Sequence, residues 1–593
     1  MIRLKKFIKL LINFKDKLYL FLIIVIIMKY SILADNYEKL ESISGKIEKT
    51  NIISKLLKKT PRKILSKVVL LLNGKVFPAW SEEKIGVANQ LMIKSISKAY
   101  GINEKDIVKE FKETGDLGLV VEKLSKSKKQ TTLGKKELDI EKVFENIQSI
   151  AKQTGSGSQD RKMDLIAELL TQAKSKEAKY IVRTVLEQLR IGVAEGIIRD
   201  AIAETFNVSA KIVENAWFLN PDYGEIAKIA KTKGEKGLEK VKVEIGRPII
   251  VLLAEKAPSL KDALNSFDEP SCEYKYDGAR MLIHKKGDKF WIFTRRLEDI
   301  TKAFPDVIEV CKKSLKAKEC IVDGEGLAID KKTGKPLPFQ TLSQRIKRKY
   351  DIKEIAKEIP IELNFFDIIY LNGKPLFDLS LKQRRKLLAK TVKEIPGKVQ
   401  LAKQLVTKDL KEADKFYKAA LKAGQEGLIV KNIKAKYQPG RRVAGGWLKV
   451  KPVLESLDLV IIGATWGTGK RAGWLGSYIL ACRDPNTGDF LECGMLGTGV
   501  KEKKSTAKDI TFKDLTKILK PNIESEKGNK VKIKPKIVIE VAYEEIQKSP
   551  TYSSSYALRF PRLLRVRWDM GPEGVDDLDR IEKIFKMQKG RKT

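Results

Sequence analysis

The period of the hydrophobic pattern changes near residue 240, and this change limits the folds open to the chain. Upstream, apolar residues recur at the helical spacing i, i+1, i+4, i+5 and i+8, as in Ile181, Val182, Val185, Leu186 and Leu189. Downstream of Val241, short runs rich in β-branched residues and bounded by turn residues predict strands. Because 593 residues are too many for one hydrophobic core, we expect several domains.

The β-containing region itself changes character after Lys451. Before that point strands alternate with helices, including a hairpin that turns at 286–288 and a helix over 381–391, which predicts an α+β domain. After it, short strands and many glycines predict a small β-barrel of the oligonucleotide-binding type. The expected fold is therefore multidomain: an all-α domain over 28–235, an α+β domain over 236–451, and a β-barrel domain with a basic tail over 452–593.

The charge balance points to a polyanionic partner. Lys and Arg number 117 against 76 Asp and Glu, a net charge of +41. Such an excess favours binding to nucleic acid or to an anionic membrane. A basic all-α domain suits a nucleic-acid backbone, although a solvated basic face explains the helical region equally well.

Cysteine and histidine usage excludes several kinds of chemistry. The five cysteines form no C-x-x-C pair, so neither a disulfide framework nor a zinc site is indicated, and we expect a reducing cytoplasm. His284 is the only histidine, which argues against a Ser-His-Asp triad. The chemistry must therefore use Lys, Arg, Asp and Glu.

The first 27 residues combine basic residues with an apolar run from Leu18 to Met28. This run of 11 residues is too short to span a bilayer, and no clear cleavage site follows it. We expect translation to start at Met28, with residues 1–27 as an unmatched extension and no stable association with a membrane.

A short segment around Lys275 is the candidate for covalent chemistry. It reads as a strand that enters a turn at Asp277-Gly278, with Glu273 and Lys275 on one face. A nucleophilic lysine needs neighbours that disfavour its ammonium form. Alone, Lys275 is as well explained as one surface lysine of many, so the segments downstream decide.

Six further segments follow in a fixed order, and the set resembles the motifs of the covalent nucleotidyltransferases, most closely ATP-dependent DNA ligases of the archaeal and eukaryotic replicative type. The seven segments are 275–280 (KYDGAR), 293–301 (FTRRLEDIT), 323–325 (DGE), 365–370 (FFDIIY), 426–431 (EGLIVK), 447–451 (WLKVK) and 559–567 (RFPRLLRVR). Upstream, 155–159 and 189–192 resemble the helical DNA-binding domain of that family.

The resemblance implies a reaction and a set of site residues. Lys275 would attack the α-phosphate of ATP, hold AMP as a phosphoamide and pass it to the 5′-phosphate of a nick, which the 3′-hydroxyl then joins. Glu273 would read the adenine edge, Phe366 would stack on the ring, and Glu325 and Glu426 would bind Mg²⁺. The other implied nucleotide and phosphate ligands are Arg280, Arg295, Glu325, Lys431, Arg442, Lys449, Lys451 and Arg562.

One spacing in this set needs explanation. Glu426 and Lys431 are five residues apart, so strict alternation places them on opposite faces of a strand. Both reach one site only if the strand starts after Glu426 or bulges at Gly427.

Two alternatives share parts of this pattern. An RNA ligase or capping-type guanylyltransferase has the same core, but the long helical domain argues against both. A non-catalytic nucleic-acid-binding protein is disfavoured because the candidate catalytic residues are intact. The resemblance further implies nicked duplex DNA as partner, a monomer with a possible sliding clamp, and roles in DNA replication, repair and recombination.

Overall fold

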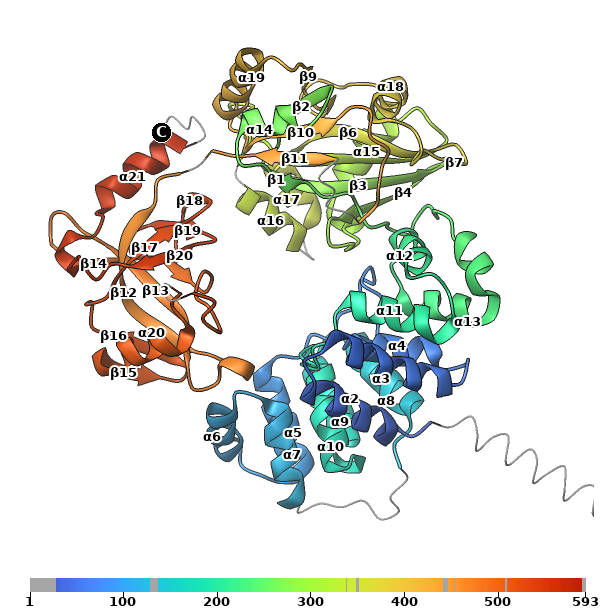
Figure 1. Ribbon diagram of the computed structural model, residues 1–593, viewed down its shortest axis with the longest axis vertical. Helices are drawn as coiled ribbons and strands as arrows, with labels where there is room; N and C mark the ends of the chain where they lie inside the picture. The colour runs from blue at the N-terminus through green and yellow to red at the C-terminus, as the bar shows by residue number, and fades with distance from the viewer. Residues whose placement is uncertain are drawn as a thin grey trace, which may run out of the picture. The chain divides into compact units, whose positions relative to one another are not determined.

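The computed structural model describes residues 28–127, 137–337, 339–347, 351–440, 446–452, 454–506 and 509–588. The expectation for residues 1–27 lies outside this range. The described residues form two compact units (Figure 1). One comprises the described residues up to Phe111, Asp116–Val251 and Arg296–Asp299, and the other holds Lys112–Gly115, Leu252–Arg295 and the described residues from Ile300 onward.

The first unit is helical, as the periodicity predicts. Its core is continuous, and the predicted apolar positions Ile181, Val182 and Val185 are buried in it. The division between the units falls after Val251, and the domain boundary at 235 remains a prediction. The α-helices are α2 (Tyr30–Ser42), α3 (Lys46–Lys59), α4 (Leu65–Leu72), α5 (Asn89–Tyr100), α6 (Glu104–Thr114), α7 (Leu117–Leu124), α8 (Ile140–Lys152), α9 (Ser158–Gln172), α10 (Ser175–Val185), α11 (Glu195–Phe206), α12 (Ala210–Leu219) and α13 (Tyr223–Glu239).

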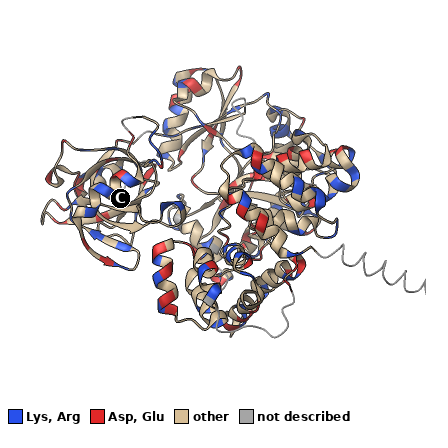
Figure 2. Ribbon diagram, turned by 60° about the horizontal axis from the view of Figure 1, so that its bottom comes forward, with Lys and Arg blue, Asp and Glu red and all other residues tan. Residues whose placement is uncertain are grey.

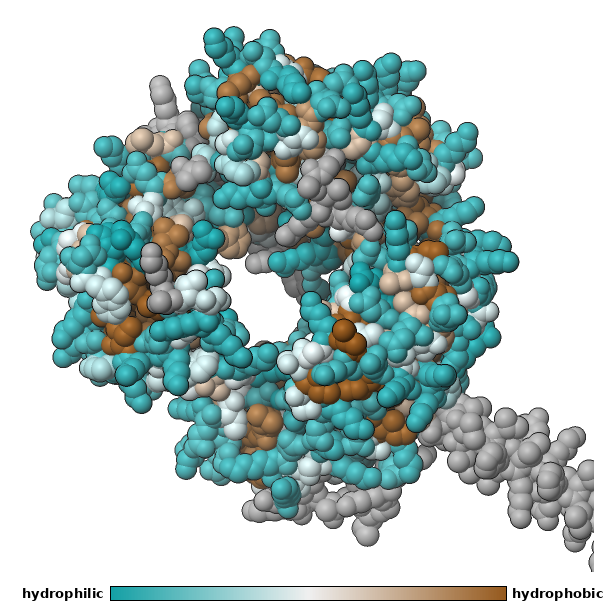
Figure 3. Space-filling model, in the orientation of Figure 1, coloured by the Kyte–Doolittle hydropathy of each residue, from teal (hydrophilic) through white to brown (hydrophobic). Residues whose placement is uncertain are grey.

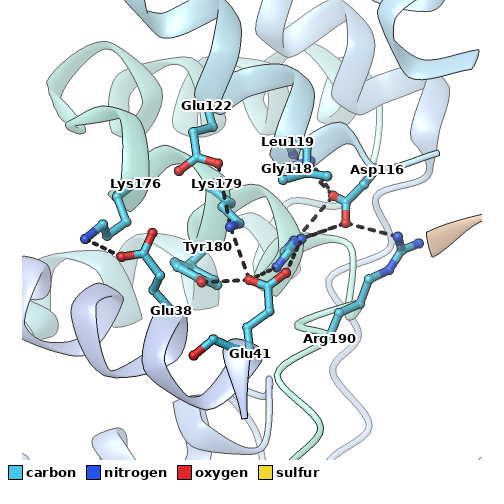
Figure 4. A network of polar contacts seen from close by, with 12 residues as sticks. Glu38, Glu41, Asp116, Gly118, Leu119, Glu122, Lys176, Lys179, Tyr180 and Arg190 are labelled. Atoms are coloured by element: carbon cyan, nitrogen blue, oxygen red, sulfur yellow. Dashed lines mark hydrogen bonds and ion pairs between the residues drawn. The ribbon is translucent and has the colours of Figure 1, made fainter. Parts of the chain in front are cut away.

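A buried ion network ties α2, α7 and α10 together (Figure 4). The Arg183 guanidinium, 3% exposed, donates to the carboxylates of both Glu41 and Asp116. Asp116 also accepts from the backbone N–H groups at the start of α7 and from Arg190 Nη1 at 3.0 Å. Asp116 therefore serves as a helix cap and as the counter-ion of two arginines.

The same network supports the loop between α10 and α11. Three residues of this loop have positive φ: Glu187 (55°), Arg190 (58°) and Gly192 (64°). The ammonium group of Lys49 donates to the carbonyl oxygens of Ile191, at 2.5 Å, and Gly192, at 3.1 Å. Side-chain bonds from two sides thus hold this loop in an unusual backbone conformation.

The central part of the second unit contains two sheets with helices around them. One has the order β4-β3-β5-β6-β7 with β8 beside β6, and the other has the order β1-β11-β10-β2-β9. The predicted hairpin is β3–β4 and the predicted helix is α18, which runs over the expected residues. The elements are β1 (Glu255–Lys256), α14 (Leu260–Asn265), β2 (Pro270–Lys275), β3 (Ala279–Lys286), β4 (Lys289–Thr294), α15 (Pro305–Ser314), β5 (Glu319–Ala328), α16 (Phe339–Lys347), α17 (Ile352–Glu358), β6 (Ile361–Leu371), β7 (Lys374–Pro375), α18 (Leu381–Thr391), β8 (Val399–Leu401), β9 (Gln404–Val406), α19 (Leu410–Lys422), β10 (Gly427–Asn432) and β11 (Trp447–Val450).

The C-terminal part is mostly β-structure with its own core. Its larger sheet runs β14-β13-β12-β16-β15, with β17 between β12 and β20, while β18 pairs only with β19. This pairing leaves the sheet open, so a closed barrel is not confirmed, and α21 is a helix that the periodicity analysis missed. The elements are β12 (Leu457–Trp466), β13 (Leu475–Arg483), β14 (Phe490–Leu496), α20 (Phe512–Leu519), β15 (Ile523–Lys527), β16 (Lys530–Ile533), β17 (Val538–Ala542), β18 (Glu545–Lys548), β19 (Tyr556–Arg559), β20 (Arg562–Val566) and α21 (Leu578–Met587).

Charged residues of both signs are interspersed along the helices and strands (Figure 2), and the face drawn in Figure 3 is mostly hydrophilic. All five cysteines are free and buried. Within the described ranges, no helix combines the length and apolarity needed to cross a bilayer.

We expect Asp116→Asn to destabilise the helical unit by about 3 kcal/mol, because it removes the charge that faces Arg183 and Arg190 inside the protein. Asparagine is a good helix cap, so the start of α7 stays satisfied. Denaturant unfolding followed by circular dichroism measures the change. Asp164→Asn, at the exposed pair with Lys98, is the matched control and should cost below about 1 kcal/mol; equal losses would contradict the network's role.

Candidate active site

The register of the five-stranded sheet places the candidate residues in two rows on one face. Glu273 of β2 lies opposite Ile429 of β10, which lies opposite Lys449 of β11, and on its other side Glu273 lies opposite Gln404 of β9. Two residues along β2, Lys275 lies opposite Gly427. Because side chains alternate along a strand, Glu273 and Lys275 share a face, as the sequence predicts.

Lys431, two residues after Ile429 on β10, lies on the same face of the sheet. Lys431 lies opposite Ser271 on one side and Trp447 on the other. Lys431, Ile429 and Gly427 therefore face the same way as Ser271, Glu273 and Lys275.

The position of Glu426 resolves the spacing question. Strand β10 begins at Gly427, so Glu426 lies before the strand, and its backbone N–H donates to the carbonyl of Lys275 at 2.8 Å. Gly427 has φ 138°, and a Cβ there would lie 2.2 Å from the carbonyl oxygen of Val450. The first of the two alternatives, a strand that starts after Glu426, is confirmed.

Glu426 joins the two lysines expected to act on the nucleotide. Its Oε2 atom lies 2.6 Å from Lys275 Nζ and 2.7 Å from Lys451 Nζ. Burial raises the pKa of this carboxyl, but the two ammonium groups outweigh it and hold the pKa well below its usual range. Lys449 stays near this cluster, and burial together with Lys451 and Lys275 lowers its pKa.

Glu325 lies in a different electrostatic environment from Glu426. It is on β5 opposite Arg280 of β3. Burial raises the pKa of Glu325 to about 8, against the opposing effect of Lys275 and Arg280. The two candidate metal ligands are therefore shifted in opposite directions, because only Glu426 has two ammonium groups in contact.

Arg280 is held by groups of the protein itself. Its guanidinium makes a two-pronged ion pair with Asp323, at 2.9 and 2.5 Å, and donates to the carbonyl of Leu252 at 2.6 Å. It also lies 5.5 Å from the ring centroids of Phe366 and Trp447. Asp323, inside a recognised motif, is thus a further residue of the site, and its role as the partner of Arg280 was not predicted.

Glu273 is fully engaged by two side chains. Its Oε2 atom accepts from Lys431 Nζ at 2.5 Å, and its Oε1 atom accepts from Gln404 Nε2 at 3.1 Å. Phe366 meets Trp447 edge-on, with ring centroids 5.7 Å apart. Sequence reasoning missed Gln404, which lies outside every motif and is brought in only by the pairing of β9 with β2.

The remaining predicted residues are less closely tied to this cluster. Arg295 is exposed in the turn after β4, and Arg562 is exposed at the start of β20. Arg442 lies outside the described residues.

The donor set suits a magnesium ion bound together with a polyphosphate. In the described part of the chain no three His, Cys, Asp or Glu side chains cluster as a protein-only metal site. However, Mg²⁺ is usually held by one or two carboxylates with phosphate oxygens and waters. The Oε2 atom of Glu426 already contacts two ammonium groups, so an ion bound here would share this carboxylate with them and take its other ligands from phosphate oxygens and waters.

We expect Gly427→Ala to destabilise the protein by about 2–3 kcal/mol, because the new methyl group would meet the Val450 carbonyl in a positive-φ backbone. Gly424→Ala is the control: Gly424 also has positive φ, at 76°, but a Cβ there meets nothing within 4 Å. Thermal unfolding of both variants measures the difference. Equal losses would assign the whole effect to backbone conformation rather than to the close approach of β11.

Comparisons with known proteins agree with this geometry. Profiles of the DNA ligase N terminus, the ATP dependent DNA ligase domain and the ATP dependent DNA ligase C terminal region match residues 29–203, 251–451 and 471–570. A DNA ligase of Nanoarchaeum equitans is 50% identical over 95% of this chain and 99% of its own, and one of Thermococcus onnurineus is 46% identical over 95% and 98%. The solved structure "Pmar-Lig_PreS3" has a similar fold, with a TM-score of 0.55 and 16% identity over 90% of this chain and 99% of its own. The chain belongs to the ATP-dependent DNA ligases.

Proposed function

We propose that this protein seals nicks in duplex DNA with Lys275 as the nucleophile and ATP as the source of AMP. The observation that carries the assignment is the cluster at the end of β2, where Lys275 Nζ lies 2.6 Å from Glu426 and beside Lys449 and Lys451. In a chain of this family, a lysine held among cations and carboxylates on one sheet face has the neighbours that phosphoryl transfer needs.

In the first step the Lys275 amine, after losing a proton to solvent, forms a bond to the α-phosphorus of ATP. The bond from that phosphorus to the bridging oxygen breaks, and pyrophosphate leaves. Lys449 of β11 and Lys451, which follows the strand, bind the phosphate oxygens as point charges, joined by Arg295, Arg442 and Arg562. AMP then passes to the 5′-phosphate of the nick, and attack by the 3′-hydroxyl releases it.

Glu325 and Glu426 would hold Mg²⁺ together with the nucleotide phosphates. When bound, the ion neutralises phosphate charge and orients the α-phosphate toward the nucleophile. Phe366 and Glu273 serve the base: the ring stacks on adenine and the carboxylate faces its amino group. Arg280, bound to Asp323, has a positioning role beside Phe366 and not a direct phosphate contact in this arrangement.

The helical unit binds the DNA backbone in this proposal. The loop after α10 offers Arg190 on a backbone that Lys49 and Asp116 hold in place. The C-terminal β-domain acts as an oligonucleotide-binding fold. The protein works as a cytoplasmic monomer in replication, repair and recombination, and a sliding clamp is its expected partner.

Incubation with α-labelled ATP and Mg²⁺ should label the wild-type protein, and Lys275→Ala should abolish the label, because Lys275 is the proposed nucleophile and the only lysine on β2. The adduct should be stable to alkali and labile to acid and to acidic hydroxylamine, as a phosphoamide is. Lys289→Ala, on the exposed start of β4, is the control and should label normally. Label that survives in Lys275→Ala would refute the assignment of the nucleophile.

Arg562→Ala tests whether the last motif acts in the first step. We expect at least a 10-fold loss of self-adenylation, since a bidentate phosphate contact is removed, and nearly normal closure of a pre-adenylated nick. Single-turnover rates of the two reactions separate the roles. Normal self-adenylation with a sealing defect that grows with salt would show instead that Arg562 only contacts DNA.

A further inference from the structure

The pair of Glu273 and Lys431 lies where a nucleotide bound at Lys275 would place its base. Glu273 is two residues before Lys275 on the same face of β2, which separates their Cα atoms by about 7 Å. The ring of Phe366 lies on the other side of Lys431, whose ammonium group is 4.5 Å from the ring centroid. A carboxylate, a cation and an aromatic ring thus lie close together, near the sheet face that also carries Lys275.

Lys431 is too enclosed to serve as a phosphate ligand. Its side chain is 2% exposed, and its ammonium group lies over the rings of both Phe366 and Trp447, 4.1 Å from the centroid of the latter. Burial lowers the pKa of Lys431, and contact with Glu273 opposes this effect. The ammonium group instead contacts Glu273, so any part that Lys431 takes in nucleotide binding acts through this carboxylate.

Both oxygens of the Glu273 carboxylate accept hydrogen bonds from side chains. Lys431 donates to one oxygen and Gln404 donates to the other, while Gln404 also donates to Ser271 Oγ. Among the described residues, Lys431 makes the only recorded ion pair with Glu273. An ionised carboxylate has no hydrogen to donate, so its remaining lone pairs can only accept.

We propose that Lys431 sets the purine specificity of the first step by holding the Glu273 carboxylate in place as an acceptor, so that this edge of the site accepts hydrogen bonds from a 6-amino purine and rejects a 6-oxo purine. The inference rests on the proposed function. Adenine presents N6–H donors at this edge, whereas guanine presents the O6 acceptor. A guanine O6 facing this carboxylate would find no donor from Glu273 and would be repelled by its oxygens, and an unpaired acceptor in a buried site gives strong discrimination between substrates.

Removal of the cation weakens this selection. In Lys431→Met, Glu273 loses the ion-pair partner that holds its Oε2 atom in place, so its oxygens are no longer fixed as acceptors at this edge. Other titratable or charged groups around the pair are Cys272 on β2, Tyr276 just after β2, Asp367 on β6 and Arg385 on α18. Asp367 is already paired with Arg384, and Arg385 donates to the carbonyls of Phe365 and Ala402, so neither replaces Lys431 as the partner of Glu273.

The test compares initial rates of self-labelling of the full chain by α-labelled ATP and GTP between pH 6.0 and 8.5. Wild type should prefer ATP by roughly 10³-fold or more at every pH. Lys431→Met should lower this ratio at least 30-fold across this pH range. Lys431→Arg, which keeps the positive charge, should retain the preference without pH dependence. Glu273→Gln, whose amide both donates and accepts, should lose selectivity equally at all pH values.

The outcomes separate this inference from the function on which it rests. If Lys431→Met labels with ATP and keeps the wild-type ratio at pH 6.0, the inference is wrong and the function stands. If Lys431→Met does not fold by circular dichroism, Glu273→Gln decides, and an unchanged ratio there overturns the inference. If both variants fold but label with neither nucleotide, the pair is needed for base binding itself and does not set its selectivity. A wild-type protein that labels with neither nucleotide would refute the proposed function instead.

Discussion

The antiparallel pairing of β2 with β10 is the constraint on which the site depends. It places Gly427 against Lys275, and the absence of a side chain at Gly427 lets β11 approach from the other side. Glu426, the residue just before β10, then lies next to Lys275. A slip of one residue in this register would turn every side chain of β10 to the opposite face and remove Lys431 from Glu273. One backbone pairing therefore sets both the proposed metal-binding end and the proposed base-binding end of the same surface.

Paired charges are buried throughout the central domain. Arg280 is paired with Asp323, Arg384 with Asp367, and Lys431 with Glu273. Such pairs add little to stability compared with apolar residues of similar size, but the loss of one partner costs several kcal/mol. Their value here is geometric, because each two-pronged or doubly bonded partner holds a side chain at a fixed angle within the sheet. A nucleotide therefore meets side chains that are already oriented, and less side-chain freedom is lost on binding.

Sequence patterns predict the elements of this protein better than the contacts between them. Alternation along β2 correctly placed Glu273 and Lys275 on one face, and the helical period correctly identified the first unit, because both depend on local backbone geometry. Gln404 could not be predicted, since only the long-range register of β9 brings it to Glu273. The position of Lys431 beside Glu273 was missed for the same reason. Motif order predicts which residues take part in the chemistry, but the partner of each residue follows from strand pairing.

The positive net charge of the whole chain and the paired charges of the candidate site have different roles. The net charge is +41, yet around the nucleophile two lysines share Glu426, and Arg280 and Lys431 each have a buried acidic partner. A site with a large excess of unpaired positive charge would bind phosphate tightly, but it would also retain pyrophosphate and AMP after each step. The uncompensated lysines must therefore lie mainly on the surface, where their effect on a duplex is long-ranged and screened by salt. We infer that surface charge promotes encounter with DNA, whereas the paired charges of the candidate site hold its side chains in fixed positions.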